Sequence, residues 1–233
     1  MNFKSIEFVD WDTGSVKKYS RTLDTIFQYN EDIDKTAYLN WRTSGTNPRR
    51  QFVVIGESYF SSAYCLIQQC LEDNIDHKAD AWIFPIMFNI VHGIEVYLKA
   101  INASLNISLG KSRTNIEGNH DIKQLCSTAK KLIIEYKAIN GNSTKDDMFK
   151  AIKVVENFIS NIYDKTDDMT FARYPMDKNK DGHFYVQSLE NEVVDLELIE
   201  EQIVIIYKLL DFIYEMPELE MELYAEMMSD MMM

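Results

Sequence analysis

The chain has 233 residues and a net charge of −13 at pH 7, with 46% hydrophobic and 26% charged residues. These proportions are ordinary for a soluble globular protein and exclude a largely disordered chain. The acidic balance excludes a protein that coats DNA or an anionic membrane by bulk attraction, because such proteins carry basic surfaces. A local basic pocket for RNA remains compatible with it.

The N-terminal stretch MNFKSIEFVDWD has no apolar core of the kind that signal peptides carry. No window holds about 18 uninterrupted apolar residues, so neither a transmembrane helix nor a membrane partner is expected. Three cysteines without a CxxC pair indicate free thiols in a reducing cytoplasm. The four histidines are too scattered for a zinc site, and no metal or other cofactor is expected.

Residues 1–50 are predicted to form a mixed N-terminal extension. Within it, FKSIEFVDW alternates weakly, as a strand does, and the following DTGS is typical of a turn. The stretch RTSGTNPRR is rich in loop formers and precedes the region 51–216, where the pattern becomes helical. We therefore expect an extension over 1–50 and a helical bundle over 51–216.

Apolar residues recur at spacings of three and four through most of the helical region. The pattern predicts helices over about 57–73, 81–103, 120–139 and 146–164. The second helix is apolar on nearly all faces and should therefore be central. Its Pro85 lies in the first turn, where a missing N–H does little harm.

A long final helix is predicted over about 194–215, where Pro217 stops or kinks it. An acidic, Met-rich tail over 217–233 follows. Methionine packs adaptably, so the tail either docks on a protein partner or frays as a chain terminus. The predicted architecture is thus mainly α-helical, with a mixed N-terminal extension and a short inserted β-hairpin before the last helix.

The inserted hairpin is predicted from RYPMDKNKDGH, residues 173–183. Its turn formers separate the aromatic stretches FARY and HFYV, as in a hairpin. The alternative is half of a calcium loop, since Asp177, Asn179 and Asp181 alternate as EF-hand ligands do. That alternative lacks the bidentate Glu at the twelfth position, which is Ser188. The hairpin is therefore favoured, with Arg173 and His183 at its two ends.

Three ionisable residues, His92, Glu95 and Lys99, form one polar stripe on the apolar second helix. Burying such groups is costly unless they are paired or lie in a solvated cleft. In one interpretation Glu95 pairs with Lys99 and His92 contacts a neighbouring segment. In the other, the stripe borders a cleft in which Glu95 orients an arginine from elsewhere, for which Arg173 is the candidate.

Two stretches, HGIEVYLKA (92–100) and GNHDIKQL (118–125), resemble the signature stretches of HEPN-type helical domains. The resemblance implies a compact bundle of two antiparallel helix pairs over about residues 55–215. It also implies a homodimer, because many members dimerise. Some members cut RNA without a metal, through an Arg followed four to six residues later by a His.

Two Arg–His pairs are candidates for that chemistry. Nine residues separate Arg173 from His183, which exceeds the family spacing, and six separate Arg113 from His120, which fits it. His120 also has a structural alternative, because GNHD is a good helix start. In metal-free RNA cleavage a His moves the proton of the 2′-OH or of the leaving oxygen, and an Arg holds the phosphate.

Two functional hypotheses follow. The first is a metal-independent RNA-cleaving enzyme or toxin-like effector, which the resemblance places in toxin–antitoxin, stress-response or phage-defence systems. Its candidate residues are Arg173, His183, Arg113, His120, His92 and Glu95. The second is a catalytically silent helical module that binds a protein partner or a nucleotide, which suits the acidic surface at least as well.

Overall fold

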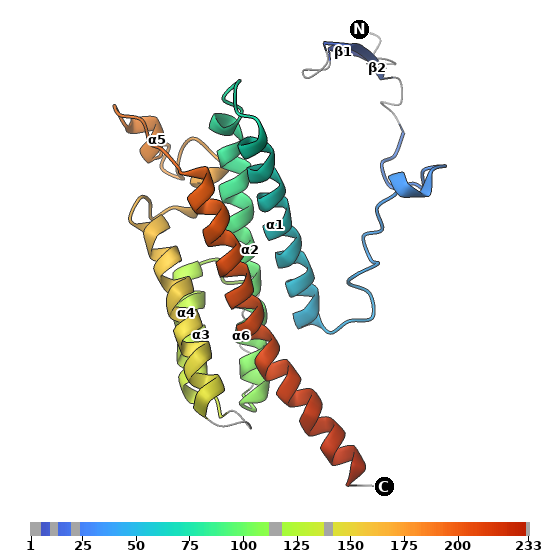
Figure 1. Ribbon diagram of the computed structural model, residues 1–233, viewed down its shortest axis with the longest axis vertical. Coiled ribbons are helices and arrows are strands. Elements are labelled where there is room, and N and C mark those ends of the chain that lie inside the picture. Colours follow the sequence, from blue (N-terminus) through green and yellow to red (C-terminus); the bar gives the residue numbers. More distant parts are fainter. Residues whose placement is uncertain (1–5, 10–13, 20–23, 112–117, 138–141, 232–233) are drawn as a thin grey trace. The chain divides into compact units, whose positions relative to one another are not determined.

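The computed structural model describes residues 6–9, 14–19, 24–111, 118–137 and 142–231 (Figure 1). It divides the chain into two compact units, Met1–Trp41 and Arg42–Met233.

The smaller unit contains a two-stranded antiparallel sheet. Strand β1 (Ile6–Val9) pairs with β2 (Val16–Tyr19), so that Ile6 lies opposite Tyr19 and Val9 opposite Val16. A short 3-10 helix, η1 (Ile33–Lys35), follows, and the Asp32 side chain accepts a hydrogen bond from the Asp34 N–H at its start.

The larger unit is helical, which confirms the prediction of a mainly α-helical fold. Its elements are α1 (Pro48–Glu72), α2 (Ala79–Ser108), α3 (Ile122–Glu135), α4 (Asn142–Tyr163), η2 (Met169–Ala172), α5 (Phe184–Gln187) and α6 (Leu196–Asp230). Figure 1 shows α1 and α2 as antiparallel neighbours, and α3 and α4 likewise.

Helix α2 is the centre of this unit, as its all-round apolar sequence predicts. It packs against α1, α3, α6 and η2. One face of α2 is fully buried along its length, through Ile86, Ile90, Ile94, Leu98, Ile101 and Leu105. Among the described residues α2 alone is long and apolar enough to cross a membrane, by length and composition, and half of its most apolar window is buried.

Helices α1 and α2 approach closely at two glycines. A Cβ atom on Gly56 would lie 2.6 Å from a ring carbon of Tyr97, and one on Gly93 would lie 3.1 Å from the Phe60 ring. The glycines therefore let two large aromatic side chains, Phe60 and Tyr97, lie between the helices, where both are buried.

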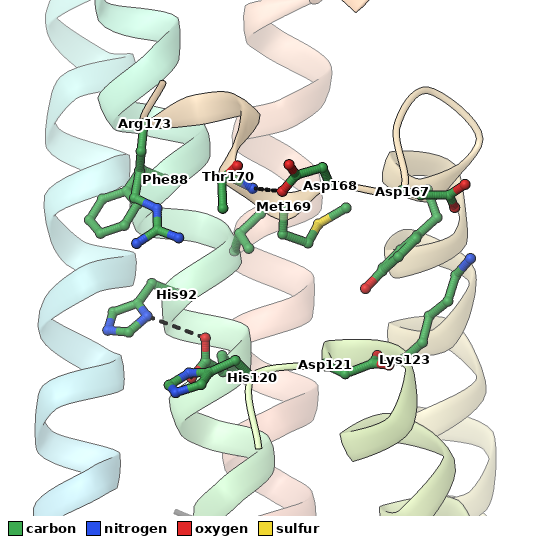
Figure 2. Close-up of a pocket in the computed structure, with 13 residues that line it drawn as sticks. Phe88, His92, His120, Asp121, Lys123, Asp167, Asp168, Met169, Thr170 and Arg173 are labelled. Atoms are coloured by element: carbon green, nitrogen blue, oxygen red, sulfur yellow. Dashed lines mark hydrogen bonds and ion pairs between the residues drawn. The ribbon is translucent and has the colours of Figure 1, made fainter. Parts of the chain in front are cut away.

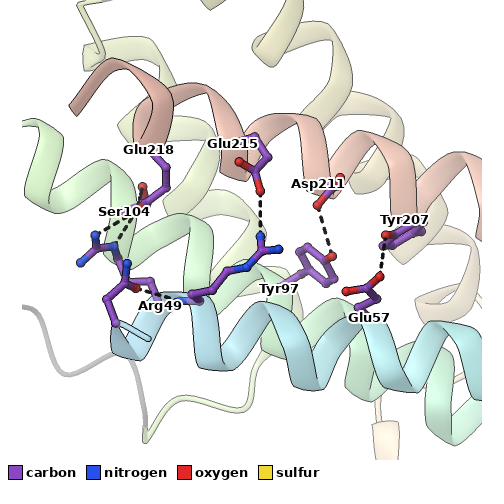
Figure 3. Close-up of polar contacts among 10 residues, drawn as sticks. Arg49, Glu57, Tyr97, Ser104, Tyr207, Asp211, Glu215 and Glu218 are labelled. Atoms are coloured by element: carbon purple, nitrogen blue, oxygen red, sulfur yellow. Dashed lines mark hydrogen bonds and ion pairs between the residues drawn. The ribbon is translucent and has the colours of Figure 1, made fainter. Parts of the chain in front are cut away.

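Polar contacts join α6 to α1 and α2 (Figure 3). The Arg49 guanidinium donates to both carboxylate oxygens of Glu218, at 2.6 and 3.0 Å, and the Ser104 hydroxyl donates to the same carboxylate at 2.7 Å. Glu215, nearly one turn before Glu218 in α6, accepts a hydrogen bond from Arg50 at 2.8 Å. These charge-assisted bonds hold the middle of α6 against the start of α1.

The helix boundaries differ from the predicted ones at both ends of the bundle. The predicted boundary between residues 50 and 51 lies within α1, which begins at Pro48 because the Asn47 side chain accepts a hydrogen bond from the Arg50 N–H. Pro217, which was predicted to stop or kink the last helix, does not stop it, because α6 continues to Asp230 with Pro217 buried inside it. The predicted tail over 217–233 is therefore helical through Asp230.

The two strands predicted on either side of the 173–183 turn are absent from the structure. Phe171 and Ala172 of FARY lie at the end of η2, and FYV of HFYV lies in α5. The aromatic side chains of the two stretches pack on one another, with Phe171 and Phe184 ring centroids 5.7 Å apart. A single antiparallel bridge, from Met176 to Gly182, lies within the turn that separates the two stretches.

Hydrogen bonds within the turn, to the Asp177 side chain and between backbone groups, close it. The Asp177 side chain accepts hydrogen bonds from the Asn179 and Asp181 N–H groups, and the Asp181 carbonyl accepts one from the Asp177 N–H. The Asp177 side chain thus has the partners that such residues have in polar turns, which accounts for its place in this turn.

Candidate functional site

A pocket of about 740 Å³ opens where α2, the start of α3 and η2 meet (Figure 2). Its volume is within the usual range for small-molecule sites. The lining residues are Phe88, Val91, His92, Glu95, His120, Asp121, Lys123, Tyr163, Asp167, Asp168, Met169, Thr170 and Arg173. Four of the six sequence candidates, His92, Glu95, His120 and Arg173, are therefore brought together in one pocket.

Glu95 is the polar residue on which the contacts of this pocket converge. Its side chain is 10% exposed, and its Oε1 accepts hydrogen bonds from Lys99 Nζ at 2.8 Å and His120 Nδ1 at 2.9 Å. Its Oε2 lies 3.5 Å from His92 Nδ1. One carboxylate thus contacts three basic side chains, two from its own helix and one from the segment before α3.

These contacts keep Glu95 ionised. Burial alone raises its pKa, but hydrogen bonds from His92, Lys99 and His120, together with the Lys99 charge, lower the pKa to about 2. The carboxylate is thus a fixed acceptor at neutral pH, and the Glu95–Lys99 pair predicted from the spacing is present. The predicted role of Glu95 in orienting Arg173 is not seen, since its partners are the two histidines and the lysine.

His120 reaches Glu95 because the start of α3 is capped by its own side chains and is also bonded to α2. The Asp121 side chain caps α3 by accepting from the Gln124 N–H, and the Asn119 side chain accepts from the Asp121 N–H. The buried Asn102 of α2 donates to the Leu125 carbonyl at 3.0 Å, which fixes α3 on α2. The His120 side chain remains 75% exposed, so its second ring nitrogen is open to a ligand.

His92 is held by aromatic rings as well as by Glu95. Its ring stacks on Phe88, one turn earlier in α2, at a centroid distance of 5.6 Å and an angle of 9°. The Tyr59 ring of α1 meets it edge-on at 4.6 Å. The imidazole is therefore fixed in orientation while its side chain stays 32% exposed.

Arg173 lies at the rim of the pocket, directly after η2. Its backbone N–H donates to the Thr170 carbonyl, and its guanidinium lies 5.9 Å from the Phe88 ring centroid and 5.6 Å from the Tyr174 centroid. No carboxylate in the described part of the chain forms an ion pair with it. Its hydrogen-bond donors are therefore available to an anion.

The pocket has two chemically different sides. Figure 2 shows Arg173, Phe88 and His92 along one side, and Asp167 and Lys123 on the other. Asp168 accepts from the Thr170 N–H at the start of η2, which lowers its pKa against the effect of burial. Lys123 Nζ lies 3.7 Å from the Tyr163 ring centroid. An anionic group is favoured on the Arg173 side, where fewer carboxylates lie.

The remaining two candidates are not part of this described pocket. His183, a candidate to act with Arg173, is buried at 5% exposure outside the pocket lining, and its ring stacks on that of Tyr185. Its N–H donates to the Pro175 carbonyl, so it closes the turn. Arg113 lies outside the described residues, and nothing places it relative to His120.

Several lining residues were missed at the sequence level. Asp121 and Asp168 both begin helical segments, and a helix-capping role was the only one that sequence reasoning gave Asp121. Asp167, Lys123 and Thr170 carry no motif that would have pointed to a pocket. Only the packing of η2 and α3 on α2 brings them together.

Comparisons of the chain with protein-family models, with curated proteins and with solved structures found no match. Within the described ranges, no group of three or more His, Cys, Asp or Glu side chains is arranged to hold a metal ion.

Proposed function

We propose that the pocket binds single-stranded RNA and cleaves its backbone without a metal ion. The observation that carries the proposal is the convergence of His92 and His120 on the ionised Glu95, beside Arg173, which forms no ion pair with the residues that the structure describes. Two imidazoles and a guanidinium are the groups that 2′-OH attack on a phosphodiester needs.

The geometry suggests a role for each residue. His120 donates its Nδ1–H to Glu95, which leaves Nε2 as the acceptor for the 2′-OH proton. The 2′-oxygen then attacks phosphorus while the bond to the 5′-oxygen breaks. His92 donates a proton to that leaving oxygen, and Arg173 holds the phosphate oxygens. The products are a 2′,3′-cyclic phosphate and a 5′-hydroxyl, so the protons balance.

The resemblance to HEPN domains supports the proposal in a specific way. The two resembling stretches supply His92 and Glu95 from residues 92–100 and His120 from 118–125, and these side chains are in contact. The acting arginine in our proposal, Arg173, lies far from both stretches in sequence. Under the same resemblance the active form is a homodimer that serves a toxin–antitoxin or phage-defence role. The three cysteines without a CxxC pair favour a cytoplasmic location.

A second candidate function is nucleotide binding without cleavage. The observation that favours it is the presence of Asp121, Asp167 and Asp168 in the same pocket, since their charges oppose a long polyanion more than a single nucleotide. In that case the Glu95 contacts brace α2 and α3, and Arg173 holds a single phosphate.

The test is cleavage of a fluorophore-quencher RNA in EDTA by the purified full chain. We expect cleavage that falls about 100-fold or more in His120→Ala, His92→Ala and Arg173→Ala. The controls are His77→Asn and Arg42→Ala, at exposed positions outside the pocket, and both should cleave like the parent chain.

A substrate with 2′-O-methyl groups should resist cleavage, because it lacks the nucleophile. Cleavage that needs a divalent ion, or that persists in all three pocket variants, would show that the proposed chemistry is wrong. Binding of RNA or a nucleotide without cleavage by any preparation would favour the second function.

A further inference from the structure

The last part of α6 extends beyond the other helices of the larger unit (Figure 1). Residues 222–230 are all exposed, yet the segment is helical through Asp230. Most helical stability in proteins comes from packing one face on a partner surface, and a short helix alone is marginal in water. The side chains along this segment therefore indicate what would cover it.

Acidic residues form one row along the segment. Glu218, Glu222, Glu226 and Asp230 follow one another at intervals of four, so they lie on the same face of the helix. Like charges at this spacing destabilise a helix, and negative charge near a C-terminus opposes the helix dipole. The last turn has no basic residue. Cations from elsewhere would remove both unfavourable effects.

The start of this row shows which cation fits. Glu218 accepts two hydrogen bonds from Arg49 of α1, and Glu215, nearly one turn earlier, pairs with Arg50 (Figure 3). Within the described residues, no cation pairs with Glu222, Glu226 or Asp230. Glu222, Glu226 and Asp230 thus continue the row of Glu218, whose partner is an arginine of another helix. A helix that carries arginines would supply the same kind of partner to these three carboxylates.

An apolar row runs beside the acidic one. Leu219, Leu223 and Met227 also follow at intervals of four, and they are 46%, 50% and 61% exposed. Exposed apolar residues that form a continuous stripe, unlike scattered ones, mark an interaction surface. We define the docking face as these three residues together with Glu222 and Glu226.

We propose that the docking face binds a basic amphipathic helix of another protein, with arginines or lysines beside an apolar stripe. Its apolar residues would pack on Leu223 and Met227, and its cations would pair with Glu222 and Glu226. Charge complementarity decides this occupant: a second copy would bring an identical acidic row, and an anionic membrane would repel it.

The test measures the binding of three fluorescently labelled peptides, each of about 18 residues, to the full chain. Fluorescence anisotropy reports the binding. The first carries Arg and Leu rows at intervals of four, the second has Glu for Arg, and the third has Ser for Leu. We expect the Arg–Leu peptide to bind and both others to bind at least about tenfold more weakly. Leu223→Ser with Met227→Ser, and separately Glu222→Gln with Glu226→Gln, should each weaken binding by about tenfold.

The matched control is Leu198→Ser with Glu201→Gln, because Leu198 is 51% exposed on the same helix but lies outside the docking face. This variant should bind the Arg–Leu peptide as the parent chain does. Equal binding of the Glu–Leu peptide, or unchanged affinity in the docking-face variants, would overturn the proposal. Self-association of the parent chain that is lost in the Leu223→Ser, Met227→Ser variant would also overturn it. Binding of the chain to phosphatidylserine vesicles, and not to the peptide, would do the same.

Discussion

At the scale of single residues, the main result is how much depends on Glu95. A carboxylate at 10% side-chain exposure is tolerated only with strong partners, and here Lys99, His120 and His92 supply them. The same contacts that stabilise the buried charge also orient two imidazoles toward the pocket. Glu95 therefore stabilises the packing of the helices and also positions the candidate catalytic groups.

Replacing Glu95 with Gln should lower the free energy of unfolding by about 3 kcal/mol at pH 7. The reason is that the folded-state pKa, about 2, lies below the ordinary value of 4.5, so the ionised form favours the folded state. This contribution is complete above about pH 4.5 and disappears as the pH falls toward about 2. The difference between parent and variant should therefore shrink by about 2 kcal/mol between pH 7 and pH 3 in urea unfolding.

The control for this prediction is Glu201→Gln, an exposed carboxylate on α6, whose effect should be small at either pH. A difference between the parent chain and Glu95→Gln that stays constant from pH 7 to pH 3 would contradict the account of Glu95 as an ionised, stabilising acceptor.

The polar stripe could be predicted from sequence, but its partners could not. His92, Glu95 and Lys99 share a face because of helical spacing, which is a local property. His120 and Arg173 reach the pocket only through the packing of α3 and η2 on α2, which no local pattern specifies. His183 was a candidate because of its place at the end of a polar turn, and the structure shows it buried beside Tyr185, outside the pocket.

At the scale of elements, α2 organises both the core and the pocket. Its apolar faces contact α1, α3 and α6, and its polar stripe faces the segments that carry His120 and Arg173. The position of α1 on α2 depends on Gly56 and Gly93, where side chains would meet aromatic rings. The register of α1, and with it the Tyr59 contact to His92, follows from this close approach.

Gly56→Ala should destabilise the bundle by about 1–3 kcal/mol, although alanine favours helix more than glycine does. The added methyl group would lie 2.6 Å from Tyr97, which is fully buried and has no room to move. Urea unfolding measures the effect. Ser61→Ala, at an exposed position of the same helix, is the control and should be neutral or slightly stabilising. A neutral Gly56→Ala would show that the helices are less closely packed than described.

A helix could be predicted where apolar residues recur at helical spacing over a long stretch, but the residues at which it begins and ends could not. The start of α1 was missed because RTSGTNPRR resembles a loop, although Asn before Pro is also a helix-start pattern. The aromatic stretches FARY and HFYV suggested strands because aromatic residues favour strands, but the same residues pack around η2 and α5. Proline did not end α6, because packing of the helix around Pro217 outweighs its local preference.

At the scale of the whole molecule, the acidic balance and the pocket are compatible. A net charge of −13 disfavours broad attraction of nucleic acid, yet Arg173 and the two pocket histidines lie together on one side of a cavity. The acidic surface instead suits a basic protein partner at the far part of α6. The larger unit thus carries a candidate RNA site and a separate docking face on different segments.

The most direct test of the central claim, that His92 and His120 share one ligand site, is the NMR spectrum of the histidine rings. The chain has only four histidines, and His77 and His183 lie outside the pocket as internal references. Adding a short 2′-O-methyl RNA, which binds without being cut, should shift the ring signals of His92 and His120 and leave those of His77 and His183 in place. Signals of His92 and His120 that do not move, or that move no more than those of His77 and His183, would contradict the account.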